Sequence, residues 1–283
     1  MKYFHYCKNK KKYFEGWFFK ASGEDLSFSA IAGISIVKQE KFAFVQVNYK
    51  KSYYQKFDFN DFSAEKDKLF IKIKDNIFSE KGIVLKLEDI EINVKFGGFE
   101  KLKGDIMGPF KCGLPCCHKI ISMAHDVRGF IRNNDETVSF TNANGYAEMD
   151  YGKSFPVKYA WIQCNNFNNI TASLFFSAAK LKLIFNFTGL ICVLKINGKD
   201  HKFATYNFAK IKRLSENEII LKKGKKTLTI KYKSNGGNAL FAPKNGGMAD
   251  IIKEDLSAGI SVTFINGREK IMLEGKNAGV ETV

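Results

Sequence analysis

The segment from Gly145 to Phe167, GYAEMDYGKSFPVKYAWIQCNNF, concentrates residue types that reaction sites use. Glu148 and Asp150 are two residues apart, so an extended chain presents both carboxyl groups on one face, where they can share or transfer a proton. Aromatic and amide side chains accompany them in the sequence: Tyr146, Tyr151, Tyr159, Trp161, Gln163 and Asn165. We interpret the segment as a candidate acid–base site. The alternative is a hydrogen-bonded polar cluster that caps a β-barrel.

The pattern of the rest of the chain predicts β-strands, which must position this segment. Apolar residues alternate most regularly from Ile90 to Phe96, and helical periodicity is almost absent, with 117–126 as a candidate short helix. Asn197-Gly198 and Asn266-Gly267 each separate apolar stretches, which predicts two hairpins because Asn-Gly accepts the positive φ of a type I′ turn. The segment 145–167 is expected to form a turn, a short arm, a second turn and a strand. We therefore predict an all-β protein.

Two parts of the chain resemble each other. Ile83 to Lys86 matches Ile219 to Lys222 at an offset of 136 residues, and a Tyr-x-Glu motif occurs at Tyr13 and again at Tyr146. We expect two similar β-barrels or sandwiches in tandem, each opened by a Tyr-x-Glu arm. The expected domains are 1–144, including a connector at about 104–128, and 145–283.

Composition restricts the function classes. The 283 residues are 45% hydrophobic and 14% aromatic, enough for a core, and no apolar run reaches the ~20 residues of a membrane-spanning helix. The net charge is +16, but only four of the 45 basic residues are arginines. Because arginine supplies the fork that grips phosphate and reads guanine, nucleic-acid binding is not expected. Lysine serves equally well in weak contact with anionic membrane surfaces.

The N-terminus is charged and lacks the apolar region of a secretory signal, and the six cysteines show no framework spacing. We expect free thiols in a cytoplasmic monomer with at most peripheral membrane association. Cysteines and histidines cluster in one stretch without the paired spacing of zinc ligands: Cys112, Cys116, Cys117, His118 and His125. We therefore expect no metal and no cofactor.

Four blocks resemble the tocopherol cyclase-like family and occur in the family's order. They are YFEGWFFK at 13–20, MGPFKCGLPCCHKIISMAHDVRG at 107–129, GYAEMDYGKSFPVKYAWIQCNNF at 145–167 and LFAPKNGGMADIIKE at 240–254. The resemblance implies a lipocalin-like architecture of two β-barrels. For the plant members it also implies cyclisation of a prenylated hydroquinone to a chromanol. This chain is shorter than the plant cyclases, and its Lys- and Asn-rich composition indicates a low-GC bacterium, where tocopherol itself is not expected.

The implied reaction assigns roles to individual residues. Chromanol closure needs a proton delivered to an alkene, and a carboxyl group in a water-poor pocket stays protonated for that task. We expect Asp150 to be the proton donor, Glu148 to tune it by like-charge repulsion, and Glu15 to be a further catalytic carboxylate. Aromatic faces would stabilise the cation. The expected substrate-binding residues are Trp17, Tyr151 and Trp161 near the cation, His118, Gln163 and Asn165 at the phenol oxygens, and Tyr146.

Three function classes remain open from the sequence. The first is a cofactor-free cyclase or isomerase of a prenylated or polyene substrate. The second is a non-catalytic lipocalin-like carrier or sensor of a hydrophobic ligand, and the third is a structural or membrane-surface protein. Each candidate residue also has a structural alternative. Glu15 and Glu148 could accept backbone N–H groups, Trp17 and Trp161 could fill a core, and His118 could be packed and hydrogen-bonded.

Overall fold

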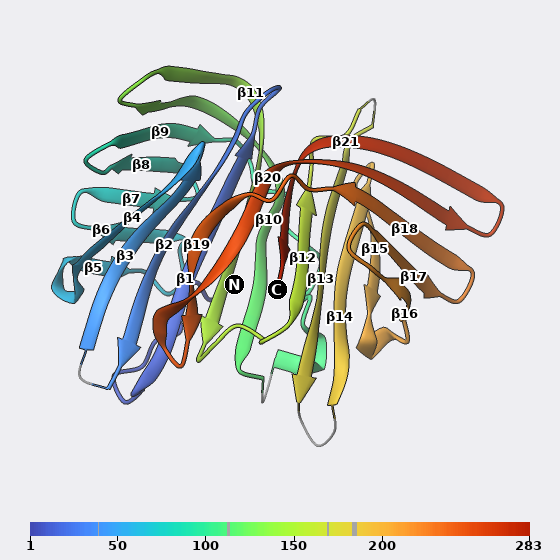
Figure 1. Ribbon diagram of the computed structural model, residues 1–283, viewed down its shortest axis with the longest axis horizontal. Helices are drawn as coiled ribbons and strands as arrows, with labels where there is room; N and C mark the ends of the chain where they lie inside the picture. Colours follow the sequence, from blue (N-terminus) through green and yellow to red (C-terminus); the bar gives the residue numbers. More distant parts are fainter. Residues whose placement is uncertain (39, 112–113, 169, 183–185) are drawn as a thin grey trace. The chain divides into compact units, whose positions relative to one another are not determined.

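A computed structural model describes residues 1–38, 40–111, 114–168, 170–182 and 186–283. In these residues the chain forms 21 β-strands and three short 3-10 helices, without an α-helix (Figure 1). None of the described helical segments has the length and apolar character needed to cross a bilayer. The paired strands run antiparallel throughout the described part of both sheets. The all-β prediction is confirmed.

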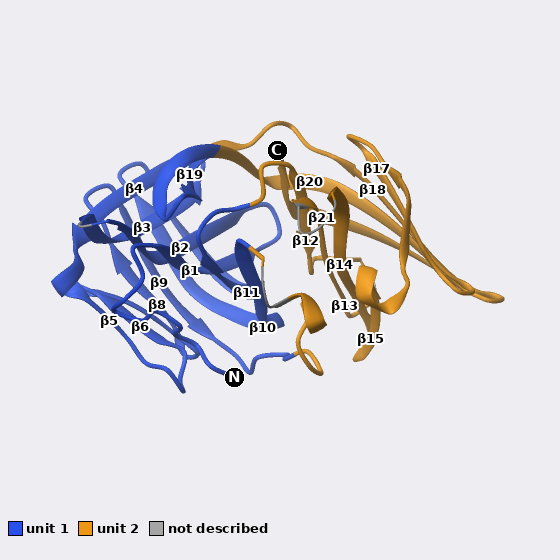
Figure 2. Cartoon of the chain, turned by 90° about the horizontal axis from the view of Figure 1, so that it is seen from below, with its two compact units in different colours: residues 1–101, 115–155, 240–251 blue, residues 102–114, 156–239, 252–283 orange. Residues whose placement is uncertain are grey.

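The strands fall into two compact units (Figure 2). Unit 1 comprises residues 1–101, 115–155 and 240–251, and unit 2 comprises residues 102–114, 156–239 and 252–283. The division expected at residues 144 and 145 differs from these units, because it falls inside strand β11 (Thr137–Gly152), which stays paired with a neighbour on each side. Both Tyr-x-Glu motifs lie in unit 1, so the expectation of one motif per unit is wrong.

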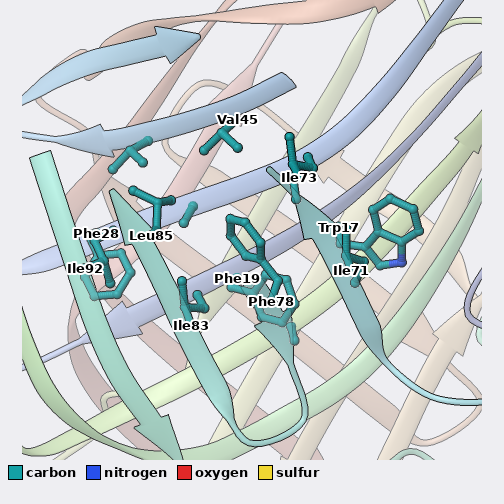
Figure 3. Packing of buried hydrophobic residues seen from close by; sticks show 14 of the residues in the cluster. Trp17, Phe19, Phe28, Val45, Ile71, Ile73, Phe78, Ile83, Leu85 and Ile92 are labelled. Atoms are coloured by element: carbon teal, nitrogen blue, oxygen red, sulfur yellow. The ribbon is translucent and has the colours of Figure 1, made fainter. Parts of the chain in front are cut away.

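Unit 1 is built on an 11-stranded sheet in the order β4-β3-β2-β1-β11-β10-β9-β8-β7-β6-β5, which curls into a nearly closed barrel. Besides β11, its strands are β1 (Lys12–Ser22), β2 (Ser27–Val37), β3 (Glu40–Tyr49), β4 (Lys51–Asp58), β5 (Phe62–Ala64), β6 (Phe70–Ile73), β7 (Asn76–Ser79), β8 (Gly82–Lys86), β9 (Ile90–Phe96) and β10 (Cys116–Asn133), with η1 (Phe59–Asp61) between β4 and β5. Strand alternation sends one face of each strand into a shared core. Figure 3 shows Phe19 and Phe78 side by side in this core, with Trp17 next to Ile71.

Unit 2 carries most of a second sheet, ordered β15-β14-β13-β12-β21-β20-β18-β17-β16, with β19 paired to β20. Its strands are β12 (Tyr159–Cys164), β13 (Ala172–Lys182), β14 (Asn186–Ile196), β15 (Lys199–Ala204), β16 (Lys210–Leu214), β17 (Glu218–Lys223), β18 (Lys226–Lys233), β19 (Asn238–Lys244), β20 (Gly247–Asn266) and β21 (Glu269–Thr282), with η2 (Gly108–Lys111) and η3 (Thr205–Asn207). Residues 240–251 of β19 and β20 belong to unit 1. A separate cluster that includes Phe176, Leu194 and Phe264 forms the core of unit 2.

The local turn signals were informative. Asn197 and Gly198 have φ values of 47° and 76° and join β14 to β15, as a type I′ turn requires. Asn266-Gly267 also joins two strands, β20 and β21, but there only Gly267 has a positive φ. The candidate helix at 117–126 does not form, because this stretch belongs to β10, where bulges next to Ser122 break the alternation.

The internal similarity is confirmed at the level of a β-hairpin. Strands β8 and β9 of unit 1 coincide, at the offset of 136 residues, with β17 and β18 of unit 2. The turns before them share a detail as well. The Ser79 hydroxyl donates to the carbonyl of Gly82 at 3.2 Å, and the Ser215 hydroxyl donates to that of Glu218 at 3.0 Å. The repeated sequence therefore repeats a structure.

The turn expected at Gly145, at the start of segment 145–167, is wrong. Instead of forming a turn, Gly145 lies in the middle of β11, opposite His125 on β10. A Cβ atom at Gly145 would stand 2.2 Å from Nε2 of His125, so the glycine is needed for close packing. The expected second turn and strand do follow, as residues 153–158 and β12.

Candidate active site

Three neighbouring strands of unit 1 position the predicted carboxylates. Asp150 on β11 pairs with Gly16 on β1 and with His118 on β10. Directly paired residues project to the same side of a sheet, and alternate residues of one strand share a side. Tyr146, Glu148 and Asp150 therefore project to one face, which we call the acid face. The alternate residues of β11, including Met149, project to the opposite face and join the core of unit 1; we call this the core face.

On the acid face, His118 lies between the two predicted carboxyl groups. Its Nδ1 atom is 3.0 Å from Oδ1 of Asp150, and its Nε2 atom is 3.6 Å from Oε2 of Glu148. The side chains of His118, Glu148 and Asp150 are 11%, 6% and 18% exposed, respectively. An imidazole between two largely buried carboxyl groups can pass a proton from one to the other.

Tyr146 fixes Glu148 from the other side. Its phenol donates to Oε2 of Glu148 at 2.6 Å. Burial, followed by the charge of Glu148, raises the pKa of Tyr146 well above its usual value, so the phenol keeps its proton and remains a donor. A donor of this kind favours the ionised form of the carboxyl group that accepts from it.

The two oxygens of Asp150 differ in their surroundings. Oδ1 faces Nδ1 of His118 and accepts a hydrogen bond from the Cys116 thiol at 3.5 Å. Burial, followed by the charge of Asp150, raises the pKa of Cys116, so this thiol also stays protonated. Oδ2 has no hydrogen-bond partner among the described residues. Next to Asp150 on β1 stands Gly16, where an added Cβ would make only ordinary contacts at 3.8 Å.

The same three side chains form a possible ligand set for a metal. Ligand atoms of His118, Glu148 and Asp150 lie within 4.8 Å of one another. One imidazole and two carboxylates suit Zn²⁺, Mn²⁺ or Fe²⁺. Of the Cys and His residues considered from the sequence, His118 belongs to this set, whereas Cys116, Cys117 and His125 do not. His125 is buried between the rings of Phe96 and Phe99, with Nδ1 3.0 Å from the Ser122 hydroxyl, and burial lowers its pKa to about 3.

Glu15 occupies the core face and is saturated by donors. Its two oxygens accept hydrogen bonds from the backbone N–H groups of His5 and Tyr6 and from the Tyr13 phenol at 2.7 Å, and Oε1 lies 2.9 Å from Nδ1 of His5. The residue is 0% exposed. His5 continues the network, because its Nε2 atom is 2.9 Å from Nζ of Lys119. Glu15 thus anchors the N-terminal segment to the barrel wall.

Two predicted aromatic residues accompany Glu15 rather than Asp150. The Trp17 indole N–H donates to the carbonyl of Tyr3 at 3.0 Å, and its ring stacks on Phe62 in the unit 1 core. Tyr151 stacks on the His5 ring at 3.9 Å. The expectation that Trp17, Tyr151 and Asp150 surround one substrate is not met within unit 1, because residues at odd spacing point to opposite faces.

The last three predicted residues lie in unit 2. Trp161 and Gln163 are buried on β12, and the buried Asn165 follows the end of that strand. Their spacing of two places them on one face of the extended chain, as the sequence indicated. Cys112 lies outside the described residues, and the prediction of cysteines outside disulfides is confirmed for those that the structure describes: Cys7, Cys116, Cys117, Cys164 and Cys192.

Sequence reasoning missed several members of the site. Phe18 pairs with Glu148 and packs edge-on against Tyr146, with ring centroids 6.5 Å apart. Lys20 pairs with Tyr146 on the same face and is almost fully buried. Both residues lie inside the YFEGWFFK block, whose alternation could have placed them on one face of β1. Only the register with β11 shows that this face is the acid face.

Unit 2 also contains a cleft of about 680 Å³. It is lined mainly by polar and charged residues, among them Arg213, Glu218, Lys231 and Glu274. None of the predicted site residues lines it. Glu218 lies 2.8 Å from Arg213 and 3.4 Å from Lys231, so these three charges of the cleft are engaged with one another.

Fold and site together define a class: an all-β protein of two lipocalin-like units with a buried carboxyl–imidazole cluster. A family model described as tocopherol cyclase-like matches residues 115–282, more than half of the chain. The chain belongs to the tocopherol cyclase-like family.

Individual known proteins are similar to this chain to different extents. The "Probable tocopherol cyclase, chloroplastic" of Oryza sativa subsp. japonica is 37% identical over 51 residues, which are 18% of this chain and only 11% of that protein. A protein provisionally named AttH from Nitrosomonas europaea has a solved structure with a TM-score of 0.57 and 14% identity, covering 94% of this chain and 91% of that one. The structure of kievitone hydratase from Nectria haematococca has a TM-score of 0.53 and 7% identity, covering 94% of this chain and 88% of that one. The structure of CghA has a TM-score of 0.59 and 8% identity, covering 96% of this chain and 88% of that one. At these identities the structural similarities establish the fold alone.

Proposed function

We propose that the protein is an intramolecular cyclase or isomerase that protonates a hydrophobic prenylated or polyene substrate at the acid face of unit 1. The observation that carries the proposal is the largely buried Glu148–His118–Asp150 cluster, in which Oδ2 of Asp150 has no partner among the described residues. Membership of the tocopherol cyclase-like family supports the choice of substrate class.

The proposed reaction moves one proton and loses no atoms. Asp150 in its acid form donates a proton from Oδ2 to an alkene carbon, which leaves a tertiary carbocation. The rings of Phe18 and Tyr146, on the same face, stabilise this cation. A phenolic oxygen of the substrate attacks the cation, and the phenolic proton passes to the carboxylate pair. His118 returns a proton to Asp150 across the 3.0 Å contact between Nδ1 and Oδ1.

The contacts distinguish the roles of the three carboxyl groups. The Tyr146 phenol donates to Glu148, which suits Glu148 to remain a carboxylate and hold negative charge near the cation. Glu15 is engaged by four donor groups on the core face, which leaves it no lone pair for a substrate. Donors reach both oxygens of Glu15, whereas the hydrogen bonds of Asp150 within the described part of the chain involve Oδ1 and leave Oδ2 available.

The proposal is tested with a panel of prenylated hydroquinones and polyenes, using chromatography with mass spectrometry. The expected product has the mass of its substrate, and in D₂O it gains one deuterium on carbon. Asp150→Asn should lower turnover at least about 100-fold, the scale of general acid catalysis. Asp126→Asn, which changes an exposed aspartate of β10, is the matched control and should keep full activity.

Circular dichroism and an unfolding curve establish that Asp150→Asn is folded. Full turnover in that variant would exclude Asp150 as the donor. Recovery of an unchanged ligand from the purified protein, with no turnover of any panel member, would favour the lipocalin-like carrier instead.

A further inference from the structure

A phenylalanine of unit 2 is held out in solvent by a fixed turn. Phe208 follows η3 and is 88% exposed, with a φ of 65°, in the left-handed region that a bulky residue rarely adopts. The turn is closed on both sides: the Phe208 N–H donates to Thr205, and the Ala209 N–H donates to Ala204. The Asn207 side chain adds hydrogen bonds to Ala204 and Lys202. A strained residue that nevertheless presents an apolar ring to water indicates a binding role.

Positive charge is concentrated around this ring. Between residues 199 and 226 the chain has nine basic and three acidic residues. On the adjacent strands, Lys210 of β16 pairs with Lys222 of β17, so both side chains project to one face. Nζ of Lys223 donates to the carbonyl of Lys202 at 3.2 Å, which brings β15 and β17 together below the turn. Figure 1 shows β16, β17 and β18 running side by side in this region.

Little of this charge is neutralised. Of the three acidic residues, Glu218 is taken by Arg213 and Lys231, and Asp200 lies 3.6 Å from Lys195. Within the described residues, Lys210, Lys212, Lys222 and Lys225 make no ion pair. Burial, followed by the neighbouring charge of Lys226, lowers the pKa of Lys223, as expected where cations crowd one another.

We propose that this region is a docking surface for an anionic lipid bilayer. We define the Phe208 surface as Phe208 with the exposed lysines Lys210, Lys212, Lys222 and Lys225. The phenyl ring would enter the boundary between headgroups and acyl chains while the lysines contact lipid phosphates. One apolar anchor combined with a basic patch supplies the two signals that stable peripheral binding needs.

The composition of the surface favours a bilayer over a nucleic acid. Arg213 is the single arginine of the nine basic residues, and it is paired with Glu218. The outward positions of β16 and β17 are lysine, arginine, glutamate, isoleucine and leucine, so the strands offer no aromatic platform on which bases could stack. The inference stands without the proposed reaction, although a water-insoluble substrate would give such a surface an obvious use.

The test is co-sedimentation with vesicles of phosphatidylcholine alone or of equal parts phosphatidylcholine and phosphatidylglycerol. The wild-type protein should bind only the anionic vesicles, and salt should weaken this binding. Phe208→Ser should reduce the affinity roughly tenfold or more, the effect of withdrawing one phenyl ring. The double variant Lys210→Gln/Lys222→Gln should reduce the affinity to a similar extent, since each lysine near the surface strengthens binding to anionic lipid about fivefold.

Matched controls separate this surface from general charge and general hydrophobicity. Val157→Ser removes another apolar residue of unit 2, which is 86% exposed, and should leave binding unchanged. Lys72→Gln/Lys86→Gln removes two exposed lysines of unit 1 and should do the same. As a direct readout, Phe208→Trp should show a blue-shifted fluorescence emission with anionic vesicles only.

Three results would overturn the proposal. The first is no binding of the wild-type protein to anionic vesicles. The second is equal loss of binding in the Phe208 surface variants and in their controls. The third is an unshifted Phe208→Trp emission together with tight, Phe208-dependent binding of a single-stranded oligonucleotide, which would assign the surface to nucleic acid.

Discussion

The two Tyr-x-Glu motifs of unit 1 make the same internal hydrogen bond on opposite faces of the same sheet. Tyr13 donates to Glu15 at 2.7 Å on the core face, and Tyr146 donates to Glu148 at 2.6 Å on the acid face. Their other neighbours differ. Glu15 is surrounded by N–H donors of the N-terminal segment, whereas Glu148 faces His118 and, beyond it, Asp150. The motif alone therefore does not make a reaction site; a second carboxyl group and an imidazole do.

The comparison predicts that Glu15 serves stability and that Asp150 serves chemistry. Glu15→Gln should lower the free energy of unfolding by about 3–5 kcal/mol, because the amide places an N–H group against donors that need an acceptor. Urea denaturation measures this loss. Glu80→Gln, which changes a half-exposed carboxylate bonded to Tyr3 and Lys101, is the control and should cost less than about 1 kcal/mol.

Turnover distinguishes the two carboxylates further. Below its unfolding transition, Glu15→Gln should retain activity, whereas Asp150→Asn should be stable and inactive. A fully stable Glu15→Gln variant without activity would contradict the division of roles between the two faces.

The tyrosines of the two Tyr-x-Glu motifs, Tyr13 and Tyr146, allow a second test of the different roles of the two faces. Tyr13→Phe and Tyr146→Phe each remove one hydrogen bond to a carboxylate, so each should cost about 1.5–3 kcal/mol in urea denaturation. Their kinetics should differ. Tyr13→Phe should leave kcat unchanged, while Tyr146→Phe should move the acid limb of the pH–rate profile to higher pH, because Glu148 then binds a proton more readily. Identical pH–rate profiles for the two variants would contradict different roles for the two faces of the sheet.

The second histidine of β10 offers a test by pH. His125 has a pKa of about 3 when folded and about 6.5 when unfolded. Between these values the unfolded chain binds more protons, so the free energy of unfolding decreases as the pH falls, by up to about 1.4 kcal/mol per pH unit. This stability is fully present above pH 6.5. His125→Gln should flatten that slope in urea denaturation series across this range, and an unchanged slope would assign the acid sensitivity to other groups.

Two glycines on neighbouring strands test whether the substrate lies beside Asp150, and the first substitution should have the smallest effect on stability of the variants considered. Gly16→Ala adds a methyl group beside Asp150 with only ordinary contacts, so stability should change by less than about 0.5 kcal/mol while turnover falls about tenfold. Its strand partner Gly33 is the control. A Cβ there would stand 2.4 Å from the Phe44 ring, so Gly33→Ala should destabilise the protein instead. Unchanged turnover in Gly16→Ala would place the substrate away from Gly16.

Local sequence patterns predicted the features that depend on residues close in the sequence: the strands, the side chains that share a face, and the hairpins. Alternation gave the all-β class and placed Glu148, Asp150 and Tyr146 on one face, and Asn-Gly gave the hairpins. The repeat at an offset of 136 residues identified an equivalent hairpin in each unit, because a hairpin is itself a local structure.

Register and irregular segments could not be predicted in the same way. Glu15 pairs with Tyr151, so it faces away from Asp150, and a shift of one residue would have reversed that result. His118 meets Asp150 only through the pairing of β10 with β11, which contains bulges. His5 lies in a stretch without periodicity, so nothing in the sequence connected it to Glu15.

The chain order of unit 1 has a consequence for how the protein is made. Its residues come from three stretches, and the last of these, 240–251, contributes groups that earlier strands require. The buried Gln46 side chain exchanges two hydrogen bonds with the backbone of Phe241, and the Ser35 hydroxyl donates to Gly246. During synthesis on the ribosome, Gln46 and Ser35 cannot form these hydrogen bonds until most of the protein has been made. Nascent chains stalled before residue 240 should therefore remain open to chaperones and proteases, whichever reaction the finished protein performs.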